Sequence, residues 1–285
     1  MLTNSDPWTH SSMLTRFRLG PNPGPMTLEG TNSYVISSPA PDFASRGSDS
    51  AGGVVVVDPG PADEPHLRAL ADCGAVELVL ITHHHRDHTA GRVRFHEMTG
   101  APIRALDPAY CIAAAPLTPG ERIFAAGVWI EVIATPGHTA DSLCFALPDD
   151  GEHGSVLTGD TILGRGSTVI CYPDGRLGSY LRSLETLQQL GPALVLPAHG
   201  PVRAGLDAVA REYLAHRHLR LAQLRSALLR LGPEASAREV AADVYSDVPG
   251  SVRAAAELSV AAQLDYLGRA GGDVPRPGGC EDGVK

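Results

Sequence analysis

The sequence predicts an α/β domain followed by a helical region. Over residues 1–205, short apolar or β-branched runs bounded by Gly, Pro or Asp alternate with amphipathic stretches, as strands alternate with helices. After Gly205 the strand-like runs stop and one long helical pattern begins. The chain has 285 residues, of which 43% are hydrophobic and 19% charged, so it can bury a sizeable core. We therefore expect an α/β domain over 1–205, a helical domain over 206–270 and a flexible Gly/Pro-rich tail over 271–285.

The expected elements follow from apolar spacing and from the residues that end each run. The strands are predicted, in order, at Asn32–Ser37, Val54–Val57, Leu78–Thr82, Ile103–Leu106, Trp129–Ala134, Leu143–Leu147, Ser155–Leu157 and Ala193–Leu196. The helices are predicted at Glu64–Cys73, Gly91–Met98, Ser179–Leu190, Leu206–Leu231, Ala237–Tyr245 and Val252–Leu267. Residues Ser38–Gly53 are rich in Ser, Pro, Gly and Ala and are expected to form a surface loop.

Charge and composition exclude several classes of protein. No run of 18 apolar residues is present, so no membrane span and no membrane partner are expected. The first 17 residues lack a basic stretch followed by an apolar one, and the five cysteines form no C-x-x-C pair, which together favour a cytoplasmic protein. The formal charge of −9 argues against a protein that coats nucleic acid, although it leaves a local basic groove possible.

Four of the twelve histidines lie within six residues, in the run V-L-I-T-H-H-H-R-D-H at 79–88. An apolar strand ends there, and His83 and His85 project to the same side of extended backbone. Asp87 and His88 follow after a turn and can face the same point from another angle. Imidazoles and a carboxylate suit zinc and similar metals, and the carboxyl end of a strand is where α/β proteins place their sites.

Three further strands end in a glycine beside a possible ligand. They are T-P-G-H-T with His138, T-G-D-T with Asp160, and P-A-H-G with His199. Glycine allows the backbone to turn sharply close to an ion. Each fragment alone is weak evidence, but their order after H-x-H-x-D-H indicates one shared metal site.

The complete set resembles the five-part signature of the metallo-β-lactamase superfamily, over residues 30 to 200. The resemblance implies an αββα sandwich with a two-metal site at one edge of its sheets. By position, it implies one metal held by His83, His85 and His138, a second held by Asp87, His88 and His199, and Asp160 bridging both. It also implies that Asp58 bonds to the ligand loop and fixes its shape.

Two divalent cations lower the pKa of a shared water, so the predicted reaction is hydrolysis by a metal-bridging hydroxide, with Asp87 and Asp160 as the catalytic carboxylates. Zinc is the expected metal, and the His/Asp set would also accept iron or manganese.

A closer resemblance is to the beta-lactamase-like protein 2 family. The segment N-P-G-P-M-T-L-E-G-T-N-S-Y at 22–34, the segment G-D-T-I-L-G-R-G-S-T at 159–168 and the stretch Tyr213 to Arg220 look like its signatures. This resemblance implies a helical, winged-helix-like C-terminal domain. Animal members of the family are described as endoribonucleases acting on single-stranded RNA, and related fungal enzymes as thioesterases.

The first hypothesis for the substrate is therefore single-stranded RNA, cleaved by an endoribonuclease-like phosphodiesterase. Its candidate substrate contacts are Arg165, Ser167, Thr168, Arg217 and Arg220. The alternative is a thioesterase or other acyl hydrolase acting on a small acyl or thioester substrate. Three other hypotheses are less favoured. A β-lactamase is less favoured because the chain keeps Asp160 where common β-lactamases have Cys, and a non-catalytic binding module because the ligand set is complete. A glyoxalase II-like enzyme would share the metal ligands, but the N-terminal signature and the C-terminal end look different.

Two features leave alternatives open. Arg217 interrupts the apolar stripe of the long helix, so it either packs its stem while its head reaches solvent or points inward at an anion. The loop Gly164–Thr168 is either an ordinary connection or a cover over the metals.

Overall fold

The computed structural model describes residues 8–38, 52–246, 250 and 253–268. The predicted tail at 271–285 and most of the predicted loop Ser38–Gly53 lie outside them. The elements in chain order are β1 (Trp8–His10), β2 (Thr15–Leu19), β3 (Asn32–Ile36), β4 (Val54–Val57), α1 (Glu64–Ala71), β5 (Val76–Leu80), α2 (Arg86–Thr89), α3 (Arg92–Thr99), β6 (Ile103–Arg104), η1 (Pro108–Tyr110), β7 (Arg122–Ala125), β8 (Val128–Ala134), β9 (Leu143–Leu147), β10 (Ser155–Gly159), α4 (Leu177–Gln188), β11 (Leu194–Pro197), α5 (Leu206–Leu231), α6 (Ala237–Val244) and α7 (Arg253–Tyr266).

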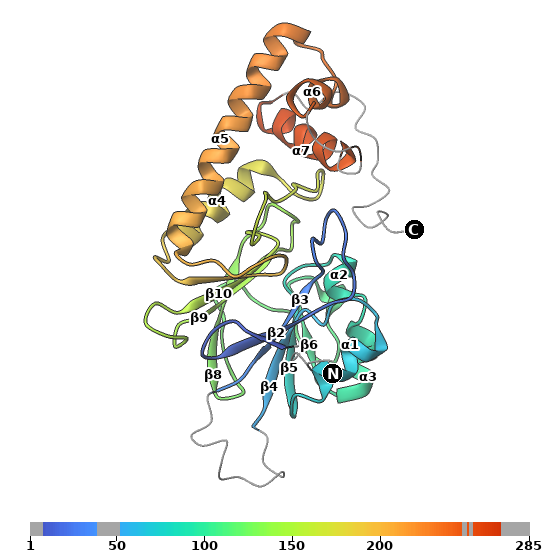
Figure 1. The fold of residues 1–285 in the computed structure, drawn as a ribbon, viewed down its shortest axis with the longest axis vertical. Coiled ribbons are helices and arrows are strands. Elements are labelled where there is room, and N and C mark those ends of the chain that lie inside the picture. Colours follow the sequence, from blue (N-terminus) through green and yellow to red (C-terminus); the bar gives the residue numbers. More distant parts are fainter. Residues whose placement is uncertain (1–7, 39–51, 247–249, 251–252, 269–285) are drawn as a thin grey trace, which may run out of the picture.

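The strands form two sheets that pack face to face (Figure 1). The first sheet has the order β1-β2-β3-β4-β5-β6, and the second has the order β11-β10-β9-β8-β7. The pairs β4/β5, β5/β6 and β10/β11 are parallel, and the other pairs are antiparallel. The candidate functional residues lie in the segments that follow the carboxyl ends of β4, β5, β8, β10 and β11.

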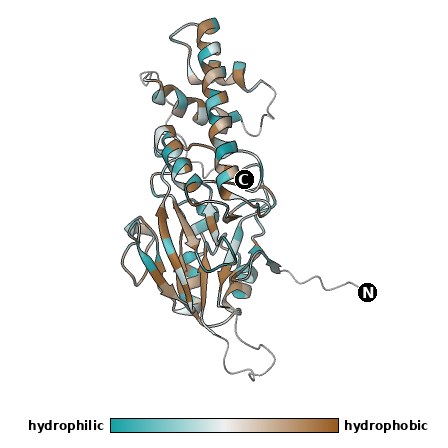
Figure 2. Cartoon of the chain, turned by 90° about the vertical axis from the view of Figure 1, so that its left-hand side faces the viewer, coloured by the Kyte–Doolittle hydropathy of each residue, from teal (hydrophilic) through white to brown (hydrophobic). Residues whose placement is uncertain are grey.

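Three apolar cores explain the layering. Between the sheets, alternate residues such as Ile36, Val57 and Leu80 of the first sheet pack with Phe145 and Leu157 of the second. The opposite face of the first sheet packs on α1 and α3, and the opposite face of the second sheet packs on α4 and α5. Because both faces of each sheet are covered, the central strands β4 and β10 are buried along their whole length, and Figure 2 shows mostly hydrophobic residues in the middle of the sheets. The predicted αββα sandwich is confirmed.

The C-terminal region is helical, as the sequence predicts. Helix α5 runs from Leu206 to Leu231, the predicted bounds, and its first half packs beside α4 (Figure 1). Its second half forms a separate small core with α6 and α7, centred on Leu224, Val240 and Val260. The described residues after 205 contain helices but no strand, so the wing of the winged-helix-like domain stays a prediction.

Within the described ranges, no helix is both long enough and apolar enough to cross a membrane.

Candidate metal centre

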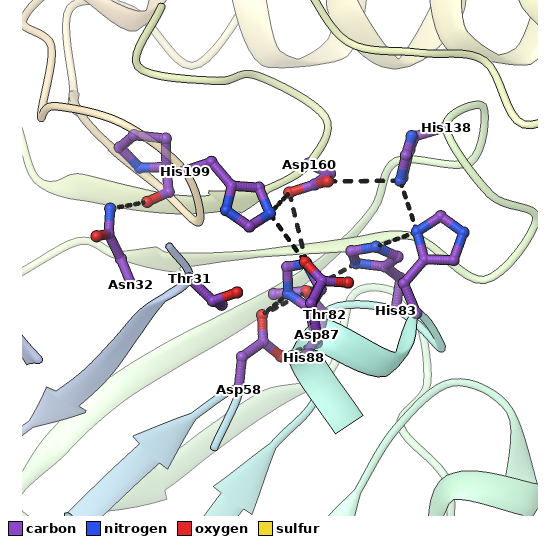
Figure 3. Close-up of polar contacts among 12 residues, drawn as sticks. Thr31, Asn32, Asp58, Thr82, His83, Asp87, His88, His138, Asp160 and His199 are labelled. Carbon is purple, nitrogen blue, oxygen red and sulfur yellow. Dashed lines mark hydrogen bonds and ion pairs between the residues drawn. The ribbon is translucent and has the colours of Figure 1, made fainter. Parts of the chain in front are cut away.

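Four segments bring the seven predicted ligands to one edge of the sandwich, and Figure 3 labels all of them except His85. The residues after β5 and at the start of α2 supply His83, His85, Asp87 and His88. The segments after β8, β10 and β11 supply one residue each: His138, Asp160 and His199. Their ligand atoms form three overlapping groups within 4.8 Å, namely His83/His85/His138, His83/His88/Asp160 and Asp87/His88/His199. The structure therefore brings together every residue that the resemblance assigned to the metals.

Three ring nitrogens converge in the first group. His85 Nδ1 lies 3.0 Å from His83 Nε2 and 3.0 Å from His138 Nε2. Burial lowers the pKa of all three imidazoles, that of His85 to about 2, so they are neutral at pH 7. Neutral imidazole nitrogens facing one another with their lone pairs are suitable ligands for a divalent metal.

Hydrogen bonds on the far side of the rings fix which nitrogen faces the centre. The Thr82 hydroxyl donates to Asp58 (2.6 Å), so its oxygen accepts from His83 Nδ1 at 3.0 Å. His138 Nδ1 donates to the Val169 carbonyl at 2.6 Å, and His199 Nδ1 donates to the Gly30 carbonyl at 3.0 Å. Since Nδ1 carries the proton in these rings, Nε2 is left with its lone pair toward the site.

Asp58 organises the loop that carries most of the ligands. Its carboxylate is 2% exposed and accepts from the Thr82 amide (2.8 Å), the Thr82 hydroxyl and His88 Nδ1 (2.8 Å). Asp58 has a φ of 52°, in the left-handed region, which turns the chain out of β4 toward the loop. The structure thus places Asp58 where the resemblance predicts it, behind the ligands and not among them.

The second group contains carboxylate oxygens as well as imidazoles. Asp87 Oδ2 lies 3.2 Å from His88 Nε2 and 3.1 Å from His199 Nε2. Asp160 Oδ1 lies 3.6 Å from His88 Nε2 and 3.4 Å from His199 Nε2, and its other oxygen lies 3.6 Å from His138 Nε2. Asp160 is therefore between the two groups.

The donor atoms fit divalent metal ions. His88 Nε2, His199 Nε2 and Asp160 Oδ1 are buried, and none is in hydrogen-bonding geometry despite the short approaches. Buried polar atoms without partners are rare in proteins, and cations between them would satisfy all three.

Protons compete with metal ions for the second group. Burial alone would lower the pKa of His88 and His199, but nearby carboxylates outweigh it and raise both pKa values: Asp87, Asp58 and Asp160 for His88, and Asp160 and Asp87 for His199. Burial raises the pKa of Asp87, and His88 and His199 outweigh it and lower that pKa. The charge balance therefore favours cations here, as protons or as metals.

A cavity of about 350 Å³ opens beside His138 and Asp160. Its wall is mainly apolar: Pro25, Met26 and Leu28 come from the segment between β2 and β3, Leu163 and Val169 from the segment after β10, and Ala255 and Ala256 from α7. Figure 1 shows the blue β2–β3 connection rising toward α7. The C-terminal helices thus contribute to the same cavity as the metal centre.

The five predicted substrate contacts lie in different environments. Arg165, Ser167, Thr168 and Arg217 line the cavity, and Arg220 does not. Arg165 forms an ion pair with Glu29 at the surface. Arg217 is 4% exposed and donates to the Thr168 carbonyl, so of the two alternatives it points inward, although the acceptor is a backbone oxygen and not an anion. Arg220 lies over the Tyr245 ring and donates to Gln223.

Two residues that support the site, Thr82 and Asn32, were not assigned this role from the sequence. Thr82 joins Asp58 to His83, and its place between a strand and the first histidine was an available signal. Asn32 donates to the carbonyls of Pro197 and Gly200 at 2.9 and 3.0 Å, which holds the loop of His199 and gives the T-N-x-Y signature a physical role.

The comparisons with known proteins agree with the geometry. No protein-family model matches the chain. It is 30% identical over 292 residues to a beta-lactamase-like protein 2 homolog from Caenorhabditis elegans, covering 96% of this chain and 86% of the relative. It is 31% identical to the lactamase-like protein nscB of Neosartorya fischeri, covering 79% of this chain but only 64% of that longer relative.

Solved structures share the fold. A metallo-beta-lactamase family protein from Thermus thermophilus superposes with a TM-score of 0.70 at 22% identity, covering 89% of this chain and 92% of that one. A beta-lactamase domain protein from Burkholderia ambifaria gives 0.72 at 20% identity, covering 94% and 92%. A protein solved in a di-iron-bound form gives 0.50 at 27% identity, covering 66% and 95%. On the identity and coverage of its relatives and on its fold, the chain belongs to the beta-lactamase-like protein 2 family of metallo-β-lactamase-fold hydrolases.

Proposed function

We propose that this protein is a two-metal hydrolase that cleaves the acyl bond of an ester or a thioester. The ion nearest His138 would be held by His83, His85 and His138, and the second by Asp87, His88 and His199, with Asp160 contacting both. The observation that carries the two-metal hydrolase is the set of buried, unpartnered atoms within overlapping groups of possible ligands. The relative solved with two irons supports a two-ion site, and zinc or iron are the metals that this donor set suits.

When bound, the two ions supply an activated water at neutral pH and stabilise negative charge on the substrate oxygen. The chain's own residues prepare that chemistry. Asp58 keeps the proton of His88 on Nδ1, and the Val169 carbonyl does the same for His138. Asp87 and Asp160 supply the carboxylate oxygens, so the charge of the centre is partly neutralised before substrate enters.

The cavity favours an acyl substrate over RNA. Among the described residues that line it, apolar side chains predominate and the aromatic rings are those of Tyr245 and of the proposed ligand His138, whereas single-stranded RNA is bound by stacking surfaces and basic grooves. Two of the arginines predicted to contact phosphate already have other partners, Glu29 for Arg165 and Gln223 for Arg220. The net charge of −9 acts in the same direction. We therefore reverse the order in which the sequence ranked the two substrates.

The proposal is tested with metal-free protein reloaded with Zn²⁺, Fe²⁺ or Mn²⁺. The substrates are acyl-coenzyme A thioesters of increasing chain length, S-lactoylglutathione, labelled single-stranded RNA and a chromogenic phosphodiester. We expect thioester turnover that His85→Ala abolishes. The matched control is His84→Ala, since His84 pairs with Asp141 at 2.8 Å and belongs to no group around Asp160.

The outcomes separate the two parts of the proposal. Cleavage of RNA with inert thioesters, lost in His85→Ala, would reject the acyl substrate and keep the metallohydrolase. A protein that binds no metal and turns over nothing in the panel would reject both.

A further inference from the structure

The segment Asp160–Val169, which we call the bridging loop, contains one of the seven proposed ligands, Asp160, and forms hydrogen bonds with two others, His138 and His199. The Thr168 hydroxyl donates to the Asp160 carbonyl at 2.8 Å, the Val169 carbonyl accepts from His138 at 2.6 Å, and the Gly164 amide donates to the His199 carbonyl at 2.8 Å. A shift of this loop would therefore move donor atoms on both sides of the metal centre.

Helix α5 holds the bridging loop at two points. Near the start of the loop, the Tyr213 hydroxyl accepts from the Leu163 amide at 3.0 Å and donates to the Leu163 carbonyl at 3.2 Å. Near the end of the loop, the Arg217 guanidinium donates to the Thr168 carbonyl. Tyr213 and Arg217 are four residues apart, so they lie on the same face of the helix, one turn from each other.

The surroundings of Arg217 are those of a fixed side chain. It is 4% exposed, and its guanidinium lies 4.9 Å from the centre of the Tyr180 ring, whose hydroxyl donates to the Thr161 carbonyl at 2.7 Å. Within the described part of the chain, no carboxylate pairs with Arg217. A buried guanidinium without an acidic partner is costly, so its contacts with the loop and with Tyr180 are the interactions that retain it.

We propose that Arg217 and Tyr213 are positioning residues for the metal centre: α5 fixes the bridging loop so that Asp160 and His138 face the metal ions. This inference rests on the proposed function, because it presumes that the seven residues bind metal. It also gives the helical region a second role, since the helix that helps close the cavity would set the affinity of the ions beside it.

The test measures metal binding, not turnover. The variants are Arg217→Met, which keeps the length of the side chain but removes its donors, and Tyr213→Phe, which removes one hydroxyl. Competition with a chelating indicator gives the affinity for Zn²⁺, and Co²⁺ substitution gives an absorption spectrum that reports the ligand arrangement. We expect affinity to fall about 10- to 100-fold in each, the range typical of residues that orient ligands, with a changed Co²⁺ spectrum.

Two further variants make the result specific. Arg217→Lys keeps a donor that can reach the Thr168 carbonyl, so it should recover much of the affinity. Arg220→Met is the matched control, because Arg220 is on the same helix three residues later and contacts His216, Gln223 and Tyr245 instead of the loop. Its affinity should equal that of the unmodified protein.

The inference is overturned if Arg217→Met and Tyr213→Phe bind Zn²⁺ as tightly as the unmodified protein. It is equally overturned if Arg220→Met weakens binding as much as they do, since the effect would then belong to the helix as a whole. If Arg217→Met does not fold, Tyr213→Phe decides. Failure of the unmodified protein to bind Zn²⁺ would instead reject the proposed function.

Discussion

Substitution of Asp58 by Asn isolates the effect of ligand orientation, because the two side chains have nearly the same shape. Asp58 Oδ1 accepts a hydrogen bond from the Thr82 amide, and Asp58 Oδ2 accepts hydrogen bonds from both the Thr82 hydroxyl and His88 Nδ1. An Asn that keeps Oδ1 on the Thr82 amide presents an NH₂ group to His88. Two donors then face each other. His88 can restore the bond only by moving its proton to Nε2, which removes the lone pair that faces Asp87 and Asp160.

The expected loss follows from that tautomer change. Loss of a partner that orients a metal-binding histidine lowers metal affinity about 10- to 100-fold, which corresponds to roughly 1.4–2.7 kcal/mol. We expect Asp58→Asn to lose affinity mainly for the ion held by Asp87, His88 and His199. Titration with a chelating indicator, combined with elemental analysis, should show one site weakened and the other less affected.

A matched control is available in a second histidine–aspartate pair, His84 with Asp141. His84 Nδ1 and Asp141 Oδ1 are 2.8 Å apart, the same distance as His88 Nδ1 and Asp58 Oδ2, but His84 shares no candidate ligand group with Asp160. Asp141→Asn should therefore bind two ions with unchanged affinity. Two ions bound with normal affinity in a folded Asp58→Asn variant would refute the orientation argument.

Three further outcomes are expected. Asp160→Ala should abolish turnover in a variant whose circular dichroism is unchanged, and normal turnover would show that Asp160 does not contact the ions. Burial, assisted by Arg18, lowers the pKa of His66 from 6.5 to about 4, so the unfolded chain binds more protons between these values and stability falls as pH drops from about 6.5 to 4. This contribution is at most about 3 kcal/mol, and urea unfolding of metal-free protein should show a weaker pH dependence in His66→Gln; parallel curves would contradict it. Gly137→Ala should destabilise the fold by about 2 kcal/mol in the same assay, since Gly137 has a φ of 149° and a Cβ there would lie 2.3 Å from Tyr180 Cα; an unchanged midpoint would contradict this.

The cluster of candidate ligands was predictable because its chemistry is carried by side chains in short, ordered fragments. H-x-H-x-D-H places four polar side chains after one strand, and each later fragment also follows a strand. Parallel and antiparallel strands of two packed sheets bring those ends to one edge, which the observed β5, β8, β10 and β11 confirm. The buried strands were found for the same reason: Val54–Val57 is buried on both faces, so its apolar run is continuous.

The strands and the helix that the sequence did not predict are those in which polar residues obscure the spacing of the apolar ones. In β2, Arg16 and Arg18 alternate with partly buried neighbours at the margin of the first sheet, and β7 is an edge strand whose Phe124 is 61% exposed. A pattern search for buried runs passes over such strands. The same limit applies to α2, a four-residue helix in which two residues, Asp87 and His88, are candidate metal ligands.

Contacts made by backbone carbonyls could not be read from the sequence at all. Gly30 and Val169 orient two histidines through main-chain oxygens, which any residue type supplies. The partners of the arginines are equally hidden, because Arg165 meets Glu29 only after the β2–β3 segment folds over the bridging loop. The sequence therefore indicates which side chains can hold a metal. Which ring nitrogen of each histidine faces the centre depends on contacts between residues far apart in the chain.

The position of these hidden contacts explains why the substrate was harder to predict than the reaction. The two ions would bring about four positive charges to a centre with two carboxylates, Asp87 and Asp160, so the net positive charge lies at the bottom of the cavity. At the rim, Arg165 is neutralised by Glu29, and the surrounding wall is aliphatic. A polyanion would find few basic groups on its way to the centre along the described residues, since Arg165 is paired with Glu29 and Arg217 is buried, whereas an uncharged acyl group loses little by leaving water and would meet the positive charge only at its carbonyl oxygen. Selectivity would then come from the apolar wall, and much of that wall belongs to the β2–β3 segment and α7, which lie outside the strand-end fragments that would hold the metals.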